Sequence, residues 1–215
     1  IRRSSATFAT SLNYVEMPVT SLTDRGTANS YIVSAPGAYD FDASVIGNGA
    51  KGVVDTAGFH TTDVAINPAS AELLWQDKAL PISNVTYNSQ SKRISFLYTG
   101  VEGNAVIAAK DASGNIIWSW HIWCTDAPVE QIYNNEAGTM MDRNLGATSA
   151  TPGDAGALGL LYQWGRKDPF VPPGRYDAEE TPSVTAPWFY KNSDGSWTKK
   201  ELLDNLHEGV LFTPN

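Results

Sequence analysis

The side chains best suited to acid-base chemistry near neutral pH are three histidines, His60, His121 and His207, which stand far apart in the chain. A metal centre or catalytic triad built from them would have to be assembled by the fold. His121 lies in a tryptophan-rich apolar segment, where a hydrogen-bonded structural histidine is the favoured interpretation. His60 is expected in a loop, and His207 near the end of a helix, where its positive charge would be favourable.

The chain has one cysteine, Cys124, which directly follows Trp123. A single thiol excludes an intramolecular disulfide and a CxxC metal site. A nucleophilic cysteine needs a neighbouring base and electropositive surroundings, whereas the acidic Asp126 is close by in the sequence. We therefore interpret Cys124 as a small, buried and unreactive thiol.

Acidic side chains outnumber basic ones, and the net charge is −8. A glycosidase needs two carboxylates at a defined separation, and Asp40, Asp42, Asp194 and the pair at 179–180 could be combined in several ways. The sequence favours none of these combinations. Residues 111–115 superficially resemble a calcium loop, but they lack the alternating oxygen ligands and the final bidentate glutamate. A hairpin turn is the better interpretation, and we expect no metal site.

Motifs that bind phosphates or nucleic acids are absent from the sequence. It contains neither GxGxxG nor GxxxxGK[ST], so no nucleotide-phosphate loop is expected. The basic residues form no stripe that could follow a phosphate backbone. No run of 18 apolar residues exists, so no membrane-spanning segment is expected either. We predict no cofactor, no catalytic residue and no nucleic-acid partner.

Two further groups of residues could bind a ligand. Asp142, Arg143 and Arg166 could form a partly buried charged network, which we favour over a ligand pocket built from Arg and Trp. Aromatic rings in loops can stack on sugars, which makes a set of four aromatic residues candidates for a ligand site. They are Tyr176, Trp188, Tyr190 and Trp197. The alternative is that these rings fill the core of a domain with little regular structure.

The elements that would position these residues are mostly short strands. Alternation of apolar and polar residues predicts strands over residues 29–34, 38–46, 71–76, 92–98, 104–110 and 115–123. The apolar faces expected on them are Tyr39, Phe41 and Ala43; Leu73 and Trp75; and Ile94, Phe96 and Tyr98. In the last strand Ile116, Trp118, Trp120 and Ile122 form a face that must be buried, and the opposite face is expected to be only partly covered.

These patterns predict a mostly β protein, with an N-terminal antiparallel, immunoglobulin-like β-sandwich followed by a loop-rich α+β domain. We expect a lead-in strand or linker at 1–28, the sandwich at 29–127 and the second domain at 128–215. Helices are predicted at 155–164 and 198–206, the latter with Thr198 as its N-cap. The chain opens at Ile1 and ends at Asn215, and we expect a trimmed N-terminus and an incomplete second domain.

Several motifs resemble known bacterial surface proteins. Residues 27–39 (TANSYIVSAPGAY) and 103–126 resemble the C-terminal region of Bacteroidales fimbrillin-type and fimbrial-tip-like surface lipoproteins. Residues 141–147 (MDRNLGA) and 159–170 (GLLYQWGRKDPF) resemble the Fibrobacter succinogenes major paralogous domain, which is thought to be related to C-type-lectin-like and formylglycine-generating-enzyme folds. Ser30 stands where the first motif would be expected to carry a cysteine. Formylglycine-type catalytic cysteines have no counterpart, because Cys124 precedes that domain.

The resemblance implies an exported protein at the outer membrane or fimbrium, with a lipid anchor on an N-terminal cysteine that this chain lacks. The leading hypothesis is a non-enzymatic adhesion or assembly component that contacts other fimbrial or surface subunits. An unpaired strand within residues 1–20 would favour strand exchange between subunits. The alternative is a lectin-like module that binds host or bacterial glycans through its loop aromatics. A third, enzymatic interpretation requires a pocket with two carboxylates at catalytic separation.

Overall fold

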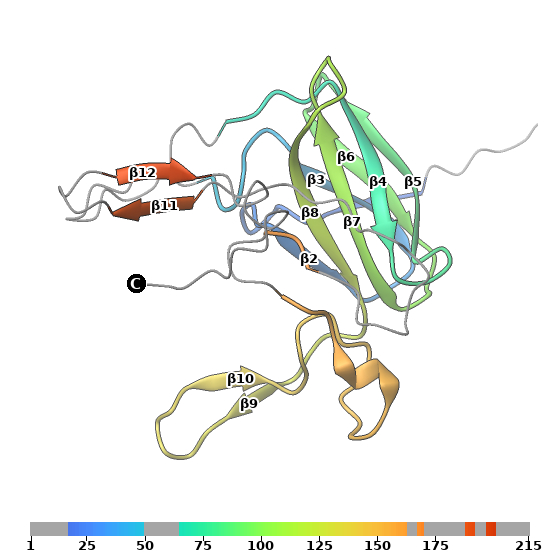
Figure 1. The fold of residues 1–215 in the computed structure, drawn as a ribbon. Helices are drawn as coiled ribbons and strands as arrows, with labels where there is room; N and C mark the ends of the chain where they lie inside the picture. The colour runs from blue at the N-terminus through green and yellow to red at the C-terminus, as the bar shows by residue number, and fades with distance from the viewer. Residues whose placement is uncertain (1–16, 50–64, 163–166, 170–187, 192–196, 201–215) are drawn as a thin grey trace, which may run out of the picture.

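The computed structural model describes residues 17–49, 65–162, 167–169, 188–191 and 197–200, the last two ranges as backbone only. The expectation of a mostly β protein is confirmed. Two four-stranded sheets face each other and share one apolar core (Figure 1). No helix among the described residues is long and apolar enough to cross a membrane.

The first sheet has the strand order β1-β3-β6-β5, and the second has the order β2-β8-β7-β4. The first contains β1 (Val19–Ser21), β3 (Gly37–Asp42), β6 (Arg93–Tyr98) and β5 (Ile82–Asn88). The second contains β2 (Ser30–Val33), β8 (Ile116–Cys124), β7 (Gly103–Lys110) and β4 (Ser70–Gln76). The predicted antiparallel topology is wrong in one respect, because β1 runs parallel to β3 and β2 runs parallel to β8. Both parallel strands come from the segment 17–34, which supplies one edge strand to each sheet.

The shared core confirms most of the predicted apolar faces. Phe41, Phe96 and Trp120 are buried where the two sheets meet, and the rings of Phe41 and Trp120 are 5.0 Å apart. Tyr39, Ala43, Ile94, Tyr98 and Ile122 are buried in the same cluster. Side chains of this size bury a large apolar area, which is the main force holding the two sheets together.

Two β-bulges overturn parts of the predicted pattern. A bulge between Leu73 and Trp75 shifts the register of β4, so Leu73 packs into the shared core and Trp75 into a second cluster on the other side of the sheet. A second bulge, between Ala109 and Lys110, falls opposite Ile117. Trp120 and Ile122, which follow this bulge, are buried in the core as predicted. Ile116, which precedes it, is half-buried and lies outside the core. Each inserted residue reverses the alternation that follows it.

Strand β5 was not predicted from the sequence. Its residues ISNVTYN include a positive φ of 53° at Asn84, and its register with β6 shifts between Ser83 and Thr86. Only Ile82 among its residues is buried, so the strand carries little apolar signal. Strand β5 is stabilised by pairing with β6, whose buried and half-buried residues alternate strictly. This stabilisation depends on a contact between strands and not on the sequence of β5 itself.

The described part of residues 128–215 contains strands and one short 3-10 helix, so the predicted α+β character is not found there. Its elements are β9 (Glu130–Ile132), β10 (Thr139–Met141), η1 (Ala155–Leu158), β11 (Trp188–Lys191) and β12 (Trp197–Lys200). The helix predicted at 155–164 ends at Leu158, because Gly159 adopts a positive φ of 71°. Thr198 pairs with Tyr190 in a strand rather than capping a helix, and residues 201–206 lie outside the described residues.

Candidate functional site

The outer face of the second sheet, the face directed away from the shared core, is covered by side chains and backbone from residues 142–162 and 167–169. Val106 of β7 and Trp75 of β4 pack there against Leu160. Ser119, His121 and Trp123 of β8 are buried on this face as well. The expectation that this side of β8 is only partly covered is therefore wrong, because the segment after the sheets folds back over it.

A chain of four polar side chains crosses this face. The Ser30 hydroxyl lies 3.0 Å from Nδ1 of His121, and Nε2 of His121 lies 2.9 Å from Oδ1 of Asn104. The Asn104 side-chain nitrogen then donates to Oδ2 of Asp77 at 2.8 Å. We call these four residues the Ser30–Asp77 relay. Ser30 is exposed at its outer end, whereas the other three residues are buried.

The partners of Asn104 determine the direction of each hydrogen bond in the relay. Its side-chain nitrogen donates both to Asp77 and to the carbonyl oxygen of Gly146, at 2.9 Å. Because both of those groups only accept, the Asn104 oxygen faces the imidazole and accepts a hydrogen bond from Nε2 of His121. Nδ1 of His121 is then the unprotonated nitrogen, and it accepts a hydrogen bond from the Ser30 hydroxyl.

Burial lowers the pKa of His121 to about 4, against a partly compensating attraction from the carboxylate of Asp168. The imidazole is therefore neutral at pH 7, and one of its ring nitrogens is free of a proton. Asp77 is held at the inner end by two bonds, because the backbone nitrogen of Asn104 also donates to its Oδ1 at 2.6 Å. A Cβ on Gly103 would lie 2.5 Å from that same oxygen, so only glycine leaves room for the carboxylate.

A second buried polar group lies beside the relay and involves Ser119, Lys167 and Asp168. The Ser119 hydroxyl is 2.6 Å from Oδ2 of Asp168, and Nζ of Lys167 is 2.7 Å from the same hydroxyl. Lys167 and Asp168 form an ion pair at 2.8 Å, with side chains that are 7% and 2% exposed. Nζ of Lys167 also lies 4.8 Å from the centre of the Trp118 ring. Charges this deeply buried are retained only when they are paired.

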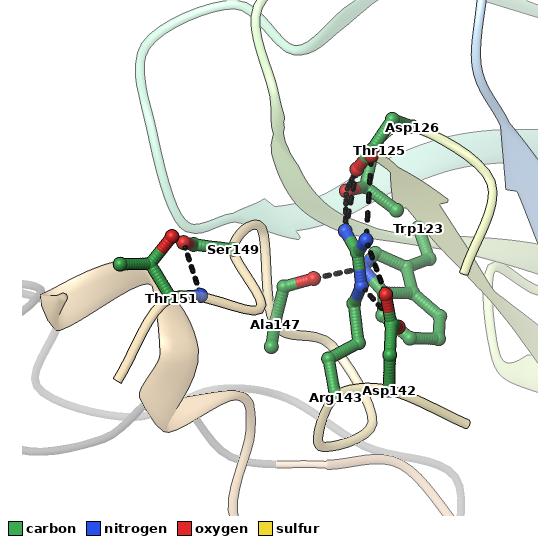
Figure 2. A network of polar contacts seen from close by, with 8 residues as sticks. All are labelled: Trp123, Thr125, Asp126, Asp142, Arg143, Ala147, Ser149 and Thr151. Atoms are coloured by element: carbon green, nitrogen blue, oxygen red, sulfur yellow. Dashed lines mark hydrogen bonds and ion pairs between the residues drawn. The ribbon is translucent and has the colours of Figure 1, made fainter. Parts of the chain in front are cut away.

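The predicted charged network is found in part: Arg143 pairs with Asp142 as predicted, and Asp126 is a further partner. The Arg143 side chain is 4% exposed and forms ion pairs with Asp142, at 2.9 Å, and with Asp126 (Figure 2). Both carboxylates raise the pKa of Arg143 by hydrogen bonding to its guanidinium, and that contact lowers the pKa of each carboxyl group. Next to it, the Trp123 indole donates to the carbonyl oxygen of Ala147 at 3.0 Å. The motif at 141–147 thus anchors the covering segment, and Arg166 lies outside the described residues.

The β9–β10 hairpin projects from the two sheets (Figure 1) and exposes apolar side chains. Ile132 is 75% exposed and Met140 58%, and every residue of the two strands is exposed. The register places Ile132 and Met141 on one face of this two-stranded ribbon and Met140 on the other. Val129 and Tyr133, next to the strands, are exposed as well, as are Leu145, Leu158, Leu161 and Tyr162 in the segment that follows. Several exposed large apolar side chains on one projecting element are typical of interaction sites in proteins. We call Val129, Ile132, Tyr133, Met140 and Met141 the hairpin patch.

The aromatic candidates are placed only in part. Trp188 and Tyr190 lie in β11 and Trp197 lies in β12, in the register that pairs Lys191 with Trp197. Three of the four therefore belong to one hairpin rather than to loops. Tyr176 lies outside the described residues, as do His60, His207, Asp194 and the pair at 179–180.

The remaining sequence candidates have structural roles. Asp40 pairs with Arg93 at 2.6 Å, and Asp42 accepts a hydrogen bond from the backbone of Ser44. Residues 111–115 form the predicted turn, in which Asp111 accepts from the backbone of Asn115 and Gly114 has a φ of 85°. Cys124 is buried as predicted, and burial raises its pKa to about 12. Among the described residues no group of His, Cys, Asp and Glu could hold a metal ion.

Ser30, Asn104 and Asp77 were not identified from the sequence as partners of His121. Ser30 and His121 are 91 positions apart and meet only because β2 pairs in parallel with β8. No local spacing signals such a pairing. Comparisons with protein-family models, curated proteins and solved structures found no match for this chain.

Proposed function

We propose that the protein is an adhesion or assembly module of a bacterial surface appendage, which contacts another surface subunit through the hairpin patch. The observation that supports the proposal is the exposure of Ile132 and Met140 on a projecting hairpin whose two strands pair only with each other among the described residues. Exposed apolar residues of this size are unfavourable in water unless a partner covers them. The location at the cell surface rests on the sequence resemblance.

The partner fitting this surface is an extended, apolar segment of a neighbouring subunit. Within the described ranges, the outer edge of each hairpin strand pairs with no further strand, so its backbone N–H and C=O groups can pair with an added strand. Strand exchange through the N-terminal segment is less favoured, since Val19 and Thr20 already pair with β3 in their own chain. Residues 1–16 lie outside the described residues.

Site-specific photocrosslinking tests this proposal. A photoreactive phenylalanine analogue replaces Tyr133 in the hairpin patch or, as a control, exposed Ser113 in the turn between β7 and β8. On the producing bacterium, the Tyr133 position is expected to crosslink to one surface subunit and the Ser113 position to none. The double substitution Ile132→Ser with Met140→Ser should abolish the adduct, while unfolding stability changes by less than about 0.5 kcal/mol because both sites are exposed. Equal crosslinking at both positions, or none, would contradict the proposal.

A lectin-like role is the second candidate, and the placement of Trp188, Tyr190 and Trp197 on one hairpin favours it. A glycan array probed with the protein tests it, with Trp188→Ala and Trp197→Ala as loss-of-binding variants. The expected result is binding to a defined sugar that each variant loses. An array without hits, together with burial of both rings, would exclude this role.

We also propose a more specific fold assignment. The strand orders β1-β3-β6-β5 and β8-β7-β4, with β2 as an additional edge strand, support an immunoglobulin-type β-sandwich, whereas the parallel pairings of β1 and β2 depart from its antiparallel sheets. Residues 128–215 would then be the separate, lectin-like part. Expression of residues 17–127 alone tests the division, although the buried bonds from Asn104 and Trp123 to residues 146 and 147 predict a loss of stability in that fragment. A fragment as stable as the whole chain would show that the contacts are dispensable.

A further inference from the structure

We propose that Ser30 is a nucleophile that reacts with small carboxylic esters, with His121 as its base and Asn104 as the residue that positions the imidazole. This inference goes beyond the proposed binding role and departs from the expectation of a non-enzymatic protein. It rests on the Ser30–Asp77 relay, which has the order of groups required for an activated hydroxyl. A nucleophile bonds to a base, and a third group bonds to the far side of that base.

The accessibility of the groups fits this role. Ser30 is exposed on the edge strand β2, whereas His121 is 7% exposed and Asn104 is fully buried. A substrate can therefore reach the hydroxyl, whereas most of the imidazole is shielded from solvent. Ile32, two residues along the same strand, is 41% exposed on the same side of the sheet and offers an apolar contact for the acyl chain.

The backbone next to Ser30 can supply a hydrogen-bond donor for the reacting oxygen. His121 donates its backbone N–H to the carbonyl oxygen of Asn29, and alternate residues bond to the neighbouring strand in a parallel ladder. The N–H of Ser30 therefore points away from β8, toward the edge of the sheet at which no other described strand pairs with β2. A donor on the nucleophile's own residue lies close to the carbonyl oxygen that becomes negative during attack.

The reaction would proceed in two balanced steps. The Ser30 oxygen attacks the ester carbonyl carbon and its proton passes to Nδ1 of His121; the C–O bond to the alcohol breaks, and the alcohol leaves with that proton. The acyl group is then bonded to Ser30. Water attacks the acyl carbon, gives its proton to His121, and releases the carboxylic acid while the proton returns to Ser30.

The charges around His121 predict the pH dependence. The carboxylate of Asp168 favours the protonated imidazole, whereas burial and the charge of Lys167 disfavour it. Asp77 lies on the far side of Asn104 from His121 and accepts two hydrogen bonds from Asn104. The imidazole is thus unprotonated from about pH 5.5 upward. Reaction at Ser30 should be independent of pH between about 5.5 and 7.5. A hydroxyl group without a base would instead react about tenfold faster for each added pH unit, in proportion to hydroxide.

The experiment treats the protein with an alkyl fluorophosphonate and with p-nitrophenyl acetate, and maps the modified residue by peptide mass spectrometry. The expected result is labelling of Ser30 and release of about one equivalent of p-nitrophenolate in an initial burst. Ser30→Ala should abolish both signals, and Ser34→Ala, another exposed serine in the same region, should leave them unchanged. His121→Gln should slow labelling about 100-fold.

Two results would overturn the proposal. One is the absence of Ser30 labelling, or equal labelling in the Ser30→Ala variant. The other is labelling of wild-type Ser30 that rises steadily with hydroxide concentration instead of showing a plateau, and this second measurement needs no substitution of the buried histidine. Substitutions in the hairpin patch should not affect either signal, so the activity and the binding role can be tested separately.

Discussion

The side-chain nitrogen of Asn104 donates a 2.9 Å hydrogen bond to the carbonyl oxygen of Gly146, and both residues are buried. The same amide also contacts Asp77 and His121. One side chain of β7 therefore joins the polar relay on the second sheet to the segment that covers it. The covering segment and the relay should respond together when this contact is disturbed, and the predictions below make use of that link.

Gly146→Ala should destabilise the protein by about 2–5 kcal/mol, the sum of backbone strain and overpacking. Gly146 has a φ of 78°, and an added Cβ would lie 2.5 Å from Cγ of Leu160. Gly138→Ala is the matched control, because Gly138 has a φ of 100° and nothing within 4 Å of the added Cβ. That variant should lose only about 1–2 kcal/mol. Urea unfolding measures the free energy of unfolding of both variants. Equal losses of stability in the two variants would show that the contact with Leu160 is unimportant.

Stability should fall as the pH decreases from 6.5 toward 4, because of His121. Its pKa is about 4 in the folded protein and about 6.5 when unfolded. Between these values the unfolded state binds the extra proton, so folding loses up to about 3 kcal/mol. His121→Gln should remove this slope between pH 6.5 and 5, above the range in which carboxyl groups titrate. Urea unfolding at several pH values tests this; an unchanged slope in the variant would assign it to other groups.

Breaking the Lys167–Asp168 pair should cost more than breaking an exposed pair. Lys167→Met leaves the carboxylate of Asp168 in a buried position, and we expect a loss of about 3 kcal/mol. Lys110→Met is the control, since the pair of Lys110 with Glu72 is 24% and 44% exposed and should contribute less than about 1 kcal/mol. Chemical unfolding of the two variants gives the comparison. Similar losses would mean that Asp168 is well solvated without Lys167.

The thiol of Cys124 should be unreactive in the folded protein. It is fully buried, and burial raises its pKa to about 12, so almost no thiolate exists at pH 8. We expect Ellman's reagent to modify the native protein at least about 100 times more slowly than the protein in 8 M urea. Rapid modification under native conditions would show that β8 opens frequently.

The sequence predicts those features of the fold that depend on neighbouring residues. The alternation of Ile94, Phe96 and Tyr98 correctly placed β6 and its buried face, and Asp111 with Gly114 correctly placed the turn between β7 and β8. Side-chain direction in a strand repeats every two residues, and turn geometry depends on a few local dihedral angles. Both properties are therefore encoded within short segments.

The tertiary structure alone decided the bulge that separates Leu73 from Trp75, the parallel pairing of β2 with β8, and the covering of Trp123 by residue 147. Each depends on groups that are distant in the sequence, and their energies arise only when the sheets have formed. His121 shows the difference most clearly. The sequence correctly indicated a hydrogen-bonded histidine but not its burial. Its bonds to Ser30 and Asn104 follow from strand pairing, which no local pattern of residues specifies.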